Sequence, residues 1–385
     1  MNFDLTPEQA EFRDIVRAFA RDVVAPGAAE RDRDETFPAE IVRAMGAMGL
    51  FGVPFPEEVG GGGGDALTFA LVIEELGRVD QSVGITLSAA VGLGAAMVER
   101  FGTNAQKERW LAPACRGELL VSFALTEPTA GSDAAALRTR ATPDGDRWTI
   151  EGSKAFITNS GTPLTGLHVV AAASEPGGGT HGISTFLVPA DTPGVTVAPA
   201  YRKLGWRSSD THELAFAGCV VPADALLGER GRGFPQCLAI LTGARISVAA
   251  LAVGLAQACL DHSLAYAKER EAFGRPIGAT QSIQMTLAEM RARVETARLA
   301  TYRAAWLRDL DRPHVAEASL AKLVAGEAAM ANARAAVQVH GGAGFMEDLP
   351  VARFYRDAKV LEIGEGTSEI HRLLLAADLG LPPAF

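Results

Sequence analysis

Cysteine is scarce in this sequence, and the four residues that occur are scattered. Cys115, Cys219, Cys237 and Cys259 form no C-x-x-C pair and no cluster with the seven dispersed histidines. They are typical of small buried side chains in a reducing compartment, and we expect a cytoplasmic protein. The pattern predicts neither a disulfide framework nor a metal site.

Basic residues are also in deficit. The chain has 36 Lys and Arg against 46 Asp and Glu, with a net charge of −10 and a pI near 5.3. This balance argues against nucleic acid, or an anionic membrane, as the main partner. Long uncharged apolar runs are few, and we expect no transmembrane helix, because a bilayer span needs about 20 predominantly apolar residues. The N-terminus, where Thr6 and Gln9 are expected to cap a helix, lacks the basic and apolar regions of a signal peptide.

Three patterns follow one another along the 385 residues, which exceed a single ordinary core. Residues 1–120 carry apolar side chains at helical spacing. Residues 121–230 alternate short β-rich runs with Gly, Pro and Asp turns, which is typical of antiparallel strands in a barrel or sandwich. Residues 231–385 return to helical spacing, with helices long enough to form an antiparallel bundle. The predicted fold class is therefore α+β and multidomain, and without a strand–GxGxxG–helix unit a nicotinamide site is not expected.

A run of five glycines, Gly60 to Gly64, interrupts the first helical region. A phosphate-binding loop is not favoured there, because no strand precedes the run and Asp65 follows it in place of a Lys or Arg. We interpret the run as a flexible connector.

Arg245 is the exception on the apolar stripe of the long helix expected from Leu238 to Cys259. A buried guanidinium is costly unless it is paired or hydrogen-bonded. Two interpretations stay open: Arg245 reaches a partner acid, or it organises an anionic or polar group of a ligand.

Glu365 stands between Gly364 and Gly366, just before Thr367, which is expected to cap the following helix. Most isolated glutamates are solvated surface carboxylates. The alternative is a catalytic base whose flanking glycines let a substrate approach closely. This loop alone favours the first interpretation.

Four other motifs are weak individually. Residues 125–133 (LTEPTAGSD) combine hydroxyls with a turn, and residues 154–161 (KAFITNSG) place Phe156 and Thr158 on one face of a strand. An aromatic ring beside a hydroxyl can hold a flat heterocycle, although more often the two are ordinary residues of the core and of the sheet edge. Residues 269–277 (EREAFGRPI) also suit an ordinary helix exit, and residues 338–345 (QVHGGAGF) leave backbone N–H groups available to an anion.

Together, and in this order with residues 363–370 (IGEGTSEI), these motifs resemble the acyl-CoA dehydrogenase family. The resemblance runs to about Leu375 and so covers nearly the whole chain. It implies an N-terminal helical domain, a middle β domain and a C-terminal four-helix bundle. It also implies FAD as the cofactor, a homotetramer built as a dimer of dimers, and an electron-transferring flavoprotein as the acceptor.

The resemblance further implies a set of FAD-binding residues. Phe156 and Thr158 would flank the isoalloxazine, with Thr158 near N5, and many relatives carry Trp where this chain has Phe156. Others would reach the FAD of the neighbouring subunit, and Thr367 and Glu369 would contact the pyrophosphate and adenosine end. The complete set is Phe123, Leu125, Thr126, Ser132, Phe156, Thr158, Arg270, Phe273, Gln281, Gln338, Gly341, Gly342, Thr367 and Glu369.

The implied reaction is α,β-dehydrogenation of an acyl thioester, from acyl-CoA to trans-2-enoyl-CoA. Glu365 would remove the α-proton while the β-hydrogen leaves as hydride to flavin N5. The Glu365 N–H and a ribityl hydroxyl would hold the thioester carbonyl. The residues that would bind the substrate are Ser132, Thr242, Arg245 and Gly366.

Two departures from the family pattern bear on the substrate. Some relatives carry the base immediately before the residue that matches Arg245, and this chain has Ala244 there, which leaves Glu365 without a competitor. Relatives often have Asp where this chain has Thr242, so an acyl-carrier-protein thioester from a biosynthetic pathway stays open. An acyl-CoA oxidase and a non-enzymatic, nucleic-acid-binding flavoprotein of the same fold are further alternatives. The length and branching of the acyl chain are not predicted.

Overall fold

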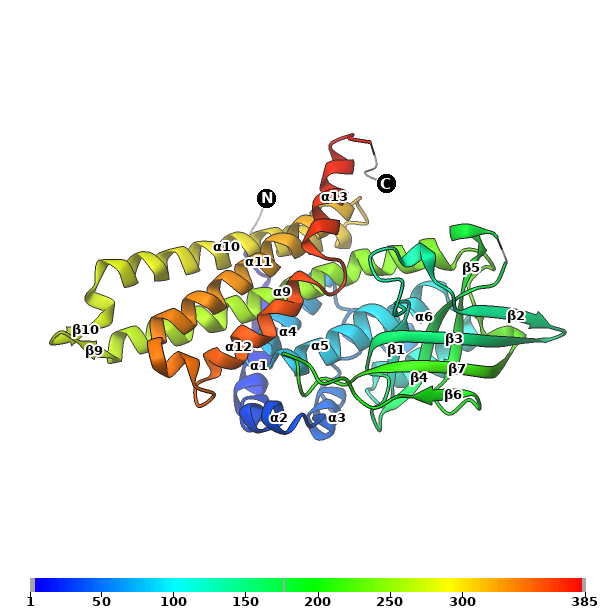
Figure 1. The fold of residues 1–385 in the computed structure, drawn as a ribbon, viewed down its shortest axis with the longest axis horizontal. Coiled ribbons are helices and arrows are strands. Elements are labelled where there is room, and N and C mark those ends of the chain that lie inside the picture. Colours follow the sequence, from blue (N-terminus) through cyan, green and yellow to red (C-terminus); the bar gives the residue numbers. More distant parts are fainter. Residues whose placement is uncertain (1–3, 176, 383–385) are drawn as a thin grey trace.

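The computed structural model describes residues 4–175 and 177–382. Helices form the N-terminal part (Figure 1). Thr6 and Gln9 make the expected capping box at the first of them, with each side chain bonded to the other residue's backbone N–H. These helices are α1 (Pro7–Phe19), α2 (Ala28–Asp34), α3 (Ala39–Ala47), α4 (Ala66–Gly77), α5 (Gln81–Ala89), α6 (Ala96–Phe101), α7 (Asn104–Gln106) and α8 (Ala112–Cys115).

The glycine run between α3 and α4 is a packed turn. The N–H groups of Gly62 and Gly64 donate to the carbonyls of Gly52 and Val53. A Cβ on Gly61 would lie 2.1 Å from the Phe55 carbonyl oxygen. Glycine is therefore required by the close approach of two backbone segments, and the interpretation of this run as a flexible connector is wrong.

The middle part is an eight-stranded sheet, in the order β6-β7-β3-β2-β4-β5-β8 with β1 paired to β4. Most pairs are antiparallel, as expected, but β1 runs parallel to β4, and β2 meets β4 in parallel at one residue pair. A separate apolar core, which includes Trp148 and Phe186, fills this domain. The strands are β1 (Leu120–Ala124), β2 (Arg140–Asp144), β3 (Arg147–Thr158), β4 (Thr165–Ala173), β5 (Ile183–Pro189), β6 (Val195–Val197), β7 (Thr211–Pro222) and β8 (Leu226–Leu227).

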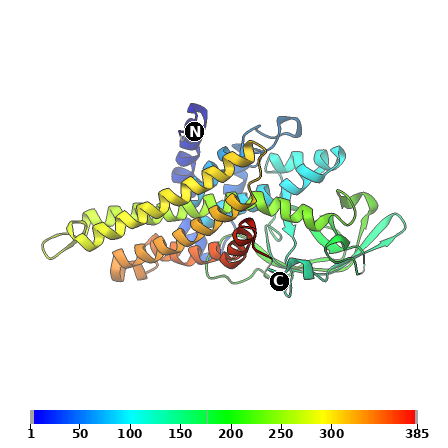
Figure 2. The ribbon, with the colours of Figure 1, turned by 90° about the horizontal axis from the view of Figure 1, so that it is seen from above.

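Long helices form the C-terminal part and extend from the end that carries β9 and β10 toward the β domain (Figures 1 and 2). Helix α11 packs against α9, α10, α12 and α13. A short hairpin of β9 (Glu271–Ala272) and β10 (Arg275–Pro276) joins α9 to α10. The helices are α9 (Gly233–Glu269), α10 (Gln281–Asp309), α11 (Val315–His340), α12 (Pro350–Ala358) and α13 (Ser368–Asp378). The fold class is confirmed, whereas the domain limits at residues 120 and 230 stay predictions.

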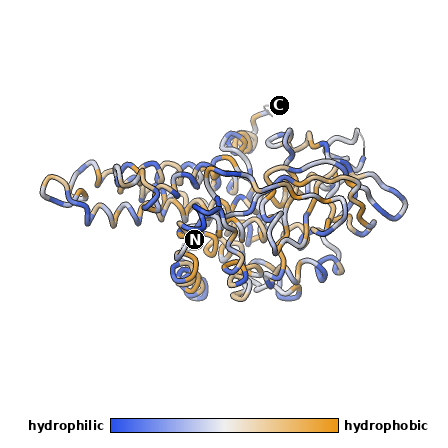
Figure 3. The backbone as a smooth tube through the Cα atoms, turned by 60° about the horizontal axis from the view of Figure 1, so that its bottom comes forward, coloured by the Kyte–Doolittle hydropathy of each residue, from blue (hydrophilic) through white to orange (hydrophobic). Residues whose placement is uncertain are grey.

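Two helical stretches are long and apolar enough to cross a membrane, Gln81–Phe101 and Gly233–Glu269. Length and composition alone do not distinguish a membrane span from a buried core helix, so the expectation of no transmembrane helix stays a prediction. In the most apolar window of each, 89% and 83% of the residues are buried inside the protein. Along the helices, hydrophobic and hydrophilic stretches of the tube alternate (Figure 3). Both stretches are core helices by this measure, and their apolar surface is covered by the chain itself.

Buried polar contacts tie the three parts together at α12. Arg356 forms an ion pair with Asp32 of α2, and the Asp357 carboxylate accepts a hydrogen bond of 2.6 Å from the Trp206 backbone N–H. Burial raises the pKa of Asp357 to about 7. The loop that carries Glu365 begins just beyond this junction, so the chain enters it from an anchored helix.

Candidate active site

Glu365 lies in a short loop between a 3₁₀ turn (Lys359–Glu362) and α13. Its backbone is in the left-handed region, with φ of +53°. Thr367 caps α13 by accepting a hydrogen bond from the Ile370 N–H, as the sequence predicts. The loop is therefore bounded by two helical segments and carries local strain at the residue with the carboxylate.

The Glu365 carboxylate is shielded from solvent, although the residue as a whole is half-buried. Its Oε2 atom is buried and has no hydrogen-bond partner among the described residues. Burial raises the pKa of Glu365 to about 7, while the nearby charges of Lys322 and Arg245 act in the opposite direction. This is not a solvated surface carboxylate. A carboxylate with such a pKa can both hold and release a proton near neutral pH.

Arg245 lies on the buried face of α9, and its positive charge acts on the same carboxylate. Burial lowers the pKa of Arg245, while the nearby charge of Glu365 acts in the opposite direction. Its Nε has no hydrogen-bond partner among the described residues, and no ion pair joins it to any of their carboxylates. Of the two interpretations left open, the structure favours a guanidinium available to a polar group of a ligand.

Lys322 is a site residue that the sequence analysis missed. It lies on α11 with an exposed fraction of 1%, and its Nζ donates a 2.6 Å hydrogen bond to the Gly366 carbonyl. A signal was present: Lys322 occupies the buried stripe that Ala318, Ala325 and Ala329 mark at helical spacing. A lone Lys on such a stripe needs a specific partner, and here the partner is the loop next to Glu365.

Phe156 and Thr158 lie at the end of β3, on the open side of the sheet. Phe156 is 65% exposed, and its ring centroid lies 5.2 Å from that of the tilted Tyr201 ring. Ile157 between them is buried, and the regular pairing with β7 is interrupted over Lys154 to Ile157. The two predicted side chains therefore share one open side of the strand, although a bulge with Phe156 at φ of +60° interrupts the regular strand geometry.

The loop at residues 125–133 is fastened to β3 by a buried ion pair. Lys154 Nζ donates to Glu127 Oε1 at 2.8 Å and to the Leu125 carbonyl at 3.0 Å. The Ala155 N–H donates to the Thr126 carbonyl. Phe123 and Thr126 are half-buried, Leu125 is buried, and Ser132 is exposed. These contacts bring the loop next to Phe156, and the sequence analysis did not find the ion pair.

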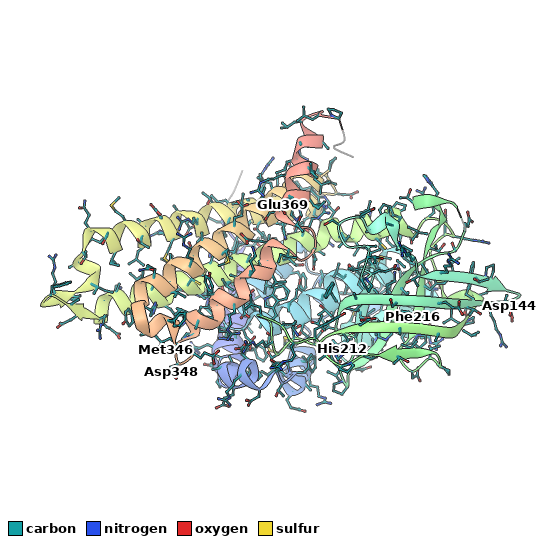
Figure 4. All side chains as sticks on the ribbon, in the orientation of Figure 1. Asp144, His212, Phe216, Met346, Asp348 and Glu369 are labelled. Atoms are coloured by element: carbon teal, nitrogen blue, oxygen red, sulfur yellow. The ribbon has the colours of Figure 1, made fainter. Side chains whose placement is uncertain are left out.

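The other predicted cofactor-binding residues lie at the opposite end of the molecule. They are on or near the β9–β10 hairpin and the 3₁₀ turn after α11, far from β3 (Figure 1). Met346 and Asp348, labelled in Figure 4, mark the loop beyond that turn, and Phe216 marks the β domain. One chain therefore does not bring the two groups together. The residues concerned, all exposed, are Arg270, Phe273, Gln281, Gln338, Gly341 and Gly342.

The remaining predicted residues lie around the Glu365 loop and on α9. Glu369 is exposed on the first turn of α13, where Figure 4 labels it, and Thr367 is half-buried beside it. The Thr242 hydroxyl is buried and donates to the Leu238 carbonyl of its own helix at 3.0 Å. Gly366 has a φ of +109°, and its carbonyl is held by Lys322.

Backbone strain coincides with the predicted site residues. Seven non-glycine residues of the described chain have a positive φ, and they include Phe156, Phe273 and Glu365. Such conformations cost of order 1–3 kcal/mol each and cluster at functional sites. Among the residues that the structure describes, no three His, Cys, Asp or Glu side chains lie close enough together to form a metal site.

Comparison with known proteins gives full-length similarity. Residues 6–118, 122–219 and 231–380 match the N-terminal, middle and C-terminal domains of acyl-CoA dehydrogenase. A probable acyl-CoA dehydrogenase of Bacillus subtilis, YngJ, is 48% identical over 98% of this chain and 100% of its own length.

Two solved structures have closely similar folds. Butyryl-CoA dehydrogenase from Megasphaera elsdenii is 40% identical, with a TM-score of 0.97 over 99% of this chain and 100% of its own. A chain in the structure of the electron transferring flavoprotein of Acidaminococcus fermentans is 41% identical, with a TM-score of 0.97 over 98% and 99%.

Proposed function

The chain belongs to the acyl-CoA dehydrogenase family of oxidoreductases, and from this premise we propose that it catalyses FAD-dependent α,β-dehydrogenation of a short acyl-CoA, with Glu365 as the base. The observation that carries the proposal is the shielded Glu365 carboxylate, unpartnered at Oε2 and flanked by the charges of Lys322 and Arg245.

The residues at the end of β3 fit FAD. Phe156 offers a ring that is 65% exposed beside the half-buried Thr158, a surface that a flat aromatic group would cover. Asn159 Oδ1 and Ser209 Oγ are buried without a partner in the described chain, and the Asn159 N–H binds the Asp210 carbonyl, so both polar atoms lie close to this strand end. Phe156, Thr158 and the loop at residues 125–133 would hold the cofactor. When bound, FAD supplies the acceptor for the β-hydrogen.

The proton chemistry belongs to the protein. Removing the weakly acidic α-proton of a thioester needs a positioned base and stabilisation of the developing negative charge. Glu365, ionised, takes the α-proton and becomes neutral. Arg245 and Lys322 keep the pocket positive while charge moves from the carboxylate to the thioester oxygen. The backbone N–H of Glu365, on a residue in the left-handed conformation, would receive the carbonyl of the substrate.

The substrate class rests on similarity and on Thr242. The relation to a butyryl-CoA dehydrogenase supports a short acyl chain. The Thr242 side chain is neutral, and its hydroxyl donates its hydrogen bond within its own helix. The hydroxyl oxygen can still accept a hydrogen bond from the carrier arm of the substrate. An electron-transferring flavoprotein is the proposed acceptor.

The proposal includes a homotetrameric assembly. Phe273 is fully exposed between β9 and β10, and this hairpin lies at the opposite end of the molecule from β3 (Figure 1), which supports a second copy supplying the rest of the site. Four buried, unpaired cysteines support a reducing compartment such as the cytoplasm.

Anaerobic titration of the FAD-loaded protein with butyryl-, octanoyl- and isobutyryl-CoA tests the proposal, with bleaching of the flavin absorption as the signal. We expect rapid bleaching with butyryl-CoA, and its loss in Glu365→Gln. Glu362→Gln is the matched control, because Glu362 lies in the adjoining turn and pairs with Lys359 outside the pocket. Equal bleaching in the Glu365 and Glu362 variants would overturn the assignment of the base.

Two outcomes would redirect the proposal. A protein that binds FAD but is bleached by no CoA ester, while an acyl-carrier-protein thioester bleaches it, is an acyl-ACP dehydrogenase. Rapid reoxidation of the reduced protein by O₂, faster than by an electron-transferring flavoprotein, identifies an oxidase.

A further inference from the structure

Lys322 reaches the Glu365 loop from a different helix. Its stem lies in the alanine-lined stripe of α11, and its ammonium donates to the Gly366 carbonyl at 2.6 Å. Gly366 directly follows the strained Glu365, so this bond holds the loop one peptide away from the carboxylate. A charged donor to a backbone carbonyl is among the stronger hydrogen bonds in a protein interior.

The charges around Glu365 come from four elements. Arg245 faces it from α9 and Lys322 from α11. The two acids nearby are engaged or exposed: Glu362 pairs with Lys359, and Glu369 lies on the surface of α13. The carboxylate is therefore surrounded by a net positive charge.

A fifth titratable group near Glu365 is His371 on α13. It is fully buried, and its ring lies against Gly366. Burial and the neighbouring cations Lys322 and Arg245 lower the pKa of His371 to about 3. His371 is consequently neutral at physiological pH and adds no charge to the site.

We propose that Lys322 is the positioning residue of the Glu365 base, acting through two separable contributions. Its bond to the Gly366 carbonyl holds the loop in the left-handed conformation that aims the carboxylate into the pocket. Its charge opposes the effect of burial on the carboxylate, so that a larger share of Glu365 is ionised near neutral pH than burial alone would allow. This inference rests on the proposed function, since it presupposes that Glu365 is the base.

Three substitutions separate the two contributions. Lys322→Met removes both the bond and the charge. Lys322→Gln keeps an N–H donor for Gly366 but removes the charge, and Lys322→Arg keeps the charge. His371→Gln is the matched control, because it alters a buried side chain against the same Gly366 without changing the charge at neutral pH.

The measurement is exchange of the α-hydrogens of acetyl-CoA with D₂O, followed by mass spectrometry across pH 5.5 to 9.5. Acetyl-CoA has α-hydrogens and no β-carbon, so proton removal is observed without oxidation. FAD content and melting temperature are recorded for every variant, and flavin bleaching by butyryl-CoA is followed over the same pH range.

For wild type we expect exchange to rise through pH of about 7, where Lys322 is still charged, because burial lowers the pKa of Lys322 only to about 8. Lys322→Gln should move that rise upward by about one pH unit, which is about a fivefold loss at pH 7 that disappears above about pH 9. Lys322→Met should show the same displacement together with a lower plateau, and Lys322→Arg should return the rise toward its wild-type position. His371→Gln should leave the position of the rise unchanged.

The inference is overturned if Lys322→Gln and Lys322→Met lower the rate by one factor at every pH, because the lysine would then act only through the fold. It is also overturned if His371→Gln displaces the rise as far as Lys322→Gln does. Failure of the proposed function looks different: wild type would neither exchange nor bleach, or Glu365→Gln would match wild type.

Discussion

The ion pair between Lys154 and Glu127 should control the stability of the loop at residues 125–133, and Lys154→Met tests this. The Lys154 side chain has no exposed surface and that of Glu127 has 4%. Glu127 also accepts hydrogen bonds from the backbone N–H groups of Arg138 and Thr139, at 2.6 and 2.9 Å. Burial opposes ionisation of Glu127, but Lys154 and these donors together outweigh it and lower the pKa. Removal of Lys154 takes away the two largest effects that hold this pKa down, so the buried carboxylate keeps only the Arg138 and Thr139 donors against the cost of burial.

The magnitude follows from what the substitution leaves behind. Lys154→Met deprives a buried carboxylate of its cation and the Leu125 carbonyl of its donor. Removing one partner of a buried pair costs about 3–5 kcal/mol. At about 1.4 kcal/mol per tenfold change, local opening should become about 100- to several thousand-fold more frequent.

Hydrogen exchange read by mass spectrometry measures that change in the peptides that cover residues 120–130 and 147–158. Lys359→Met is the control, because Lys359 is half-exposed in its ion pair with Glu362 and such pairs contribute about 1 kcal/mol or less. Adding Glu127→Gln to Lys154→Met should restore part of the protection, since the uncompensated charge is then gone. Less than a tenfold change in these peptides for Lys154→Met would refute the reasoning.

Three further predictions concern catalysis, cofactor binding and packing. Because Glu365 must lose its proton to act, kcat/KM should rise with pH through about 7 and stand at about a tenth of its plateau at pH 6. Acyl-pantetheine, which lacks the titrating phosphate of CoA, is the substrate control. A flat profile from pH 5.5 to 8 contradicts the assignment. Phe156→Ala should lower the ratio of bound flavin to protein while the melting temperature of the apoprotein barely changes, because the ring is largely exposed. Gly205→Ala would place a methyl group 2.5 Å from the Arg356 carbonyl oxygen and should cost about 1–3 kcal/mol, seen as a lower melting temperature, whereas Gly62→Ala meets only ordinary contacts and should cost less.

Local features of the chain were predictable because their causes are local. The Thr6–Gln9 capping box and the Thr367 cap depend on residues three positions apart, and both form as expected. The helical spacing after residue 231 follows from a periodicity that the sequence displays directly. Glu365, between two glycines, could also be proposed as the base from the sequence, because five motifs occur along the chain in the order that carries the family resemblance.

The parts that failed depend on approach between distant segments. The composition of residues 60–64 predicts a flexible connector, because composition does not reveal that Val53 and Phe55 pack against these glycines. The parallel pairing of β1 with β4 joins residues more than 40 positions apart, and short apolar runs carry no signal of direction. Composition likewise does not show what covers an apolar helix, since burial by other helices and burial by lipid select similar residues.

The sequence by itself determined the fold class, the family and Glu365 as the candidate base, because periodicity, caps and ordered motifs are properties of neighbouring residues. Only the tertiary structure decided that the Glu365 carboxylate is shielded, that Lys322, 44 positions away from Gly366, holds its loop, and that the predicted cofactor residues lie at two ends of one chain. The physical reason is that a pKa and a site depend on what packs around a group, and packing brings together residues that the chain order keeps apart.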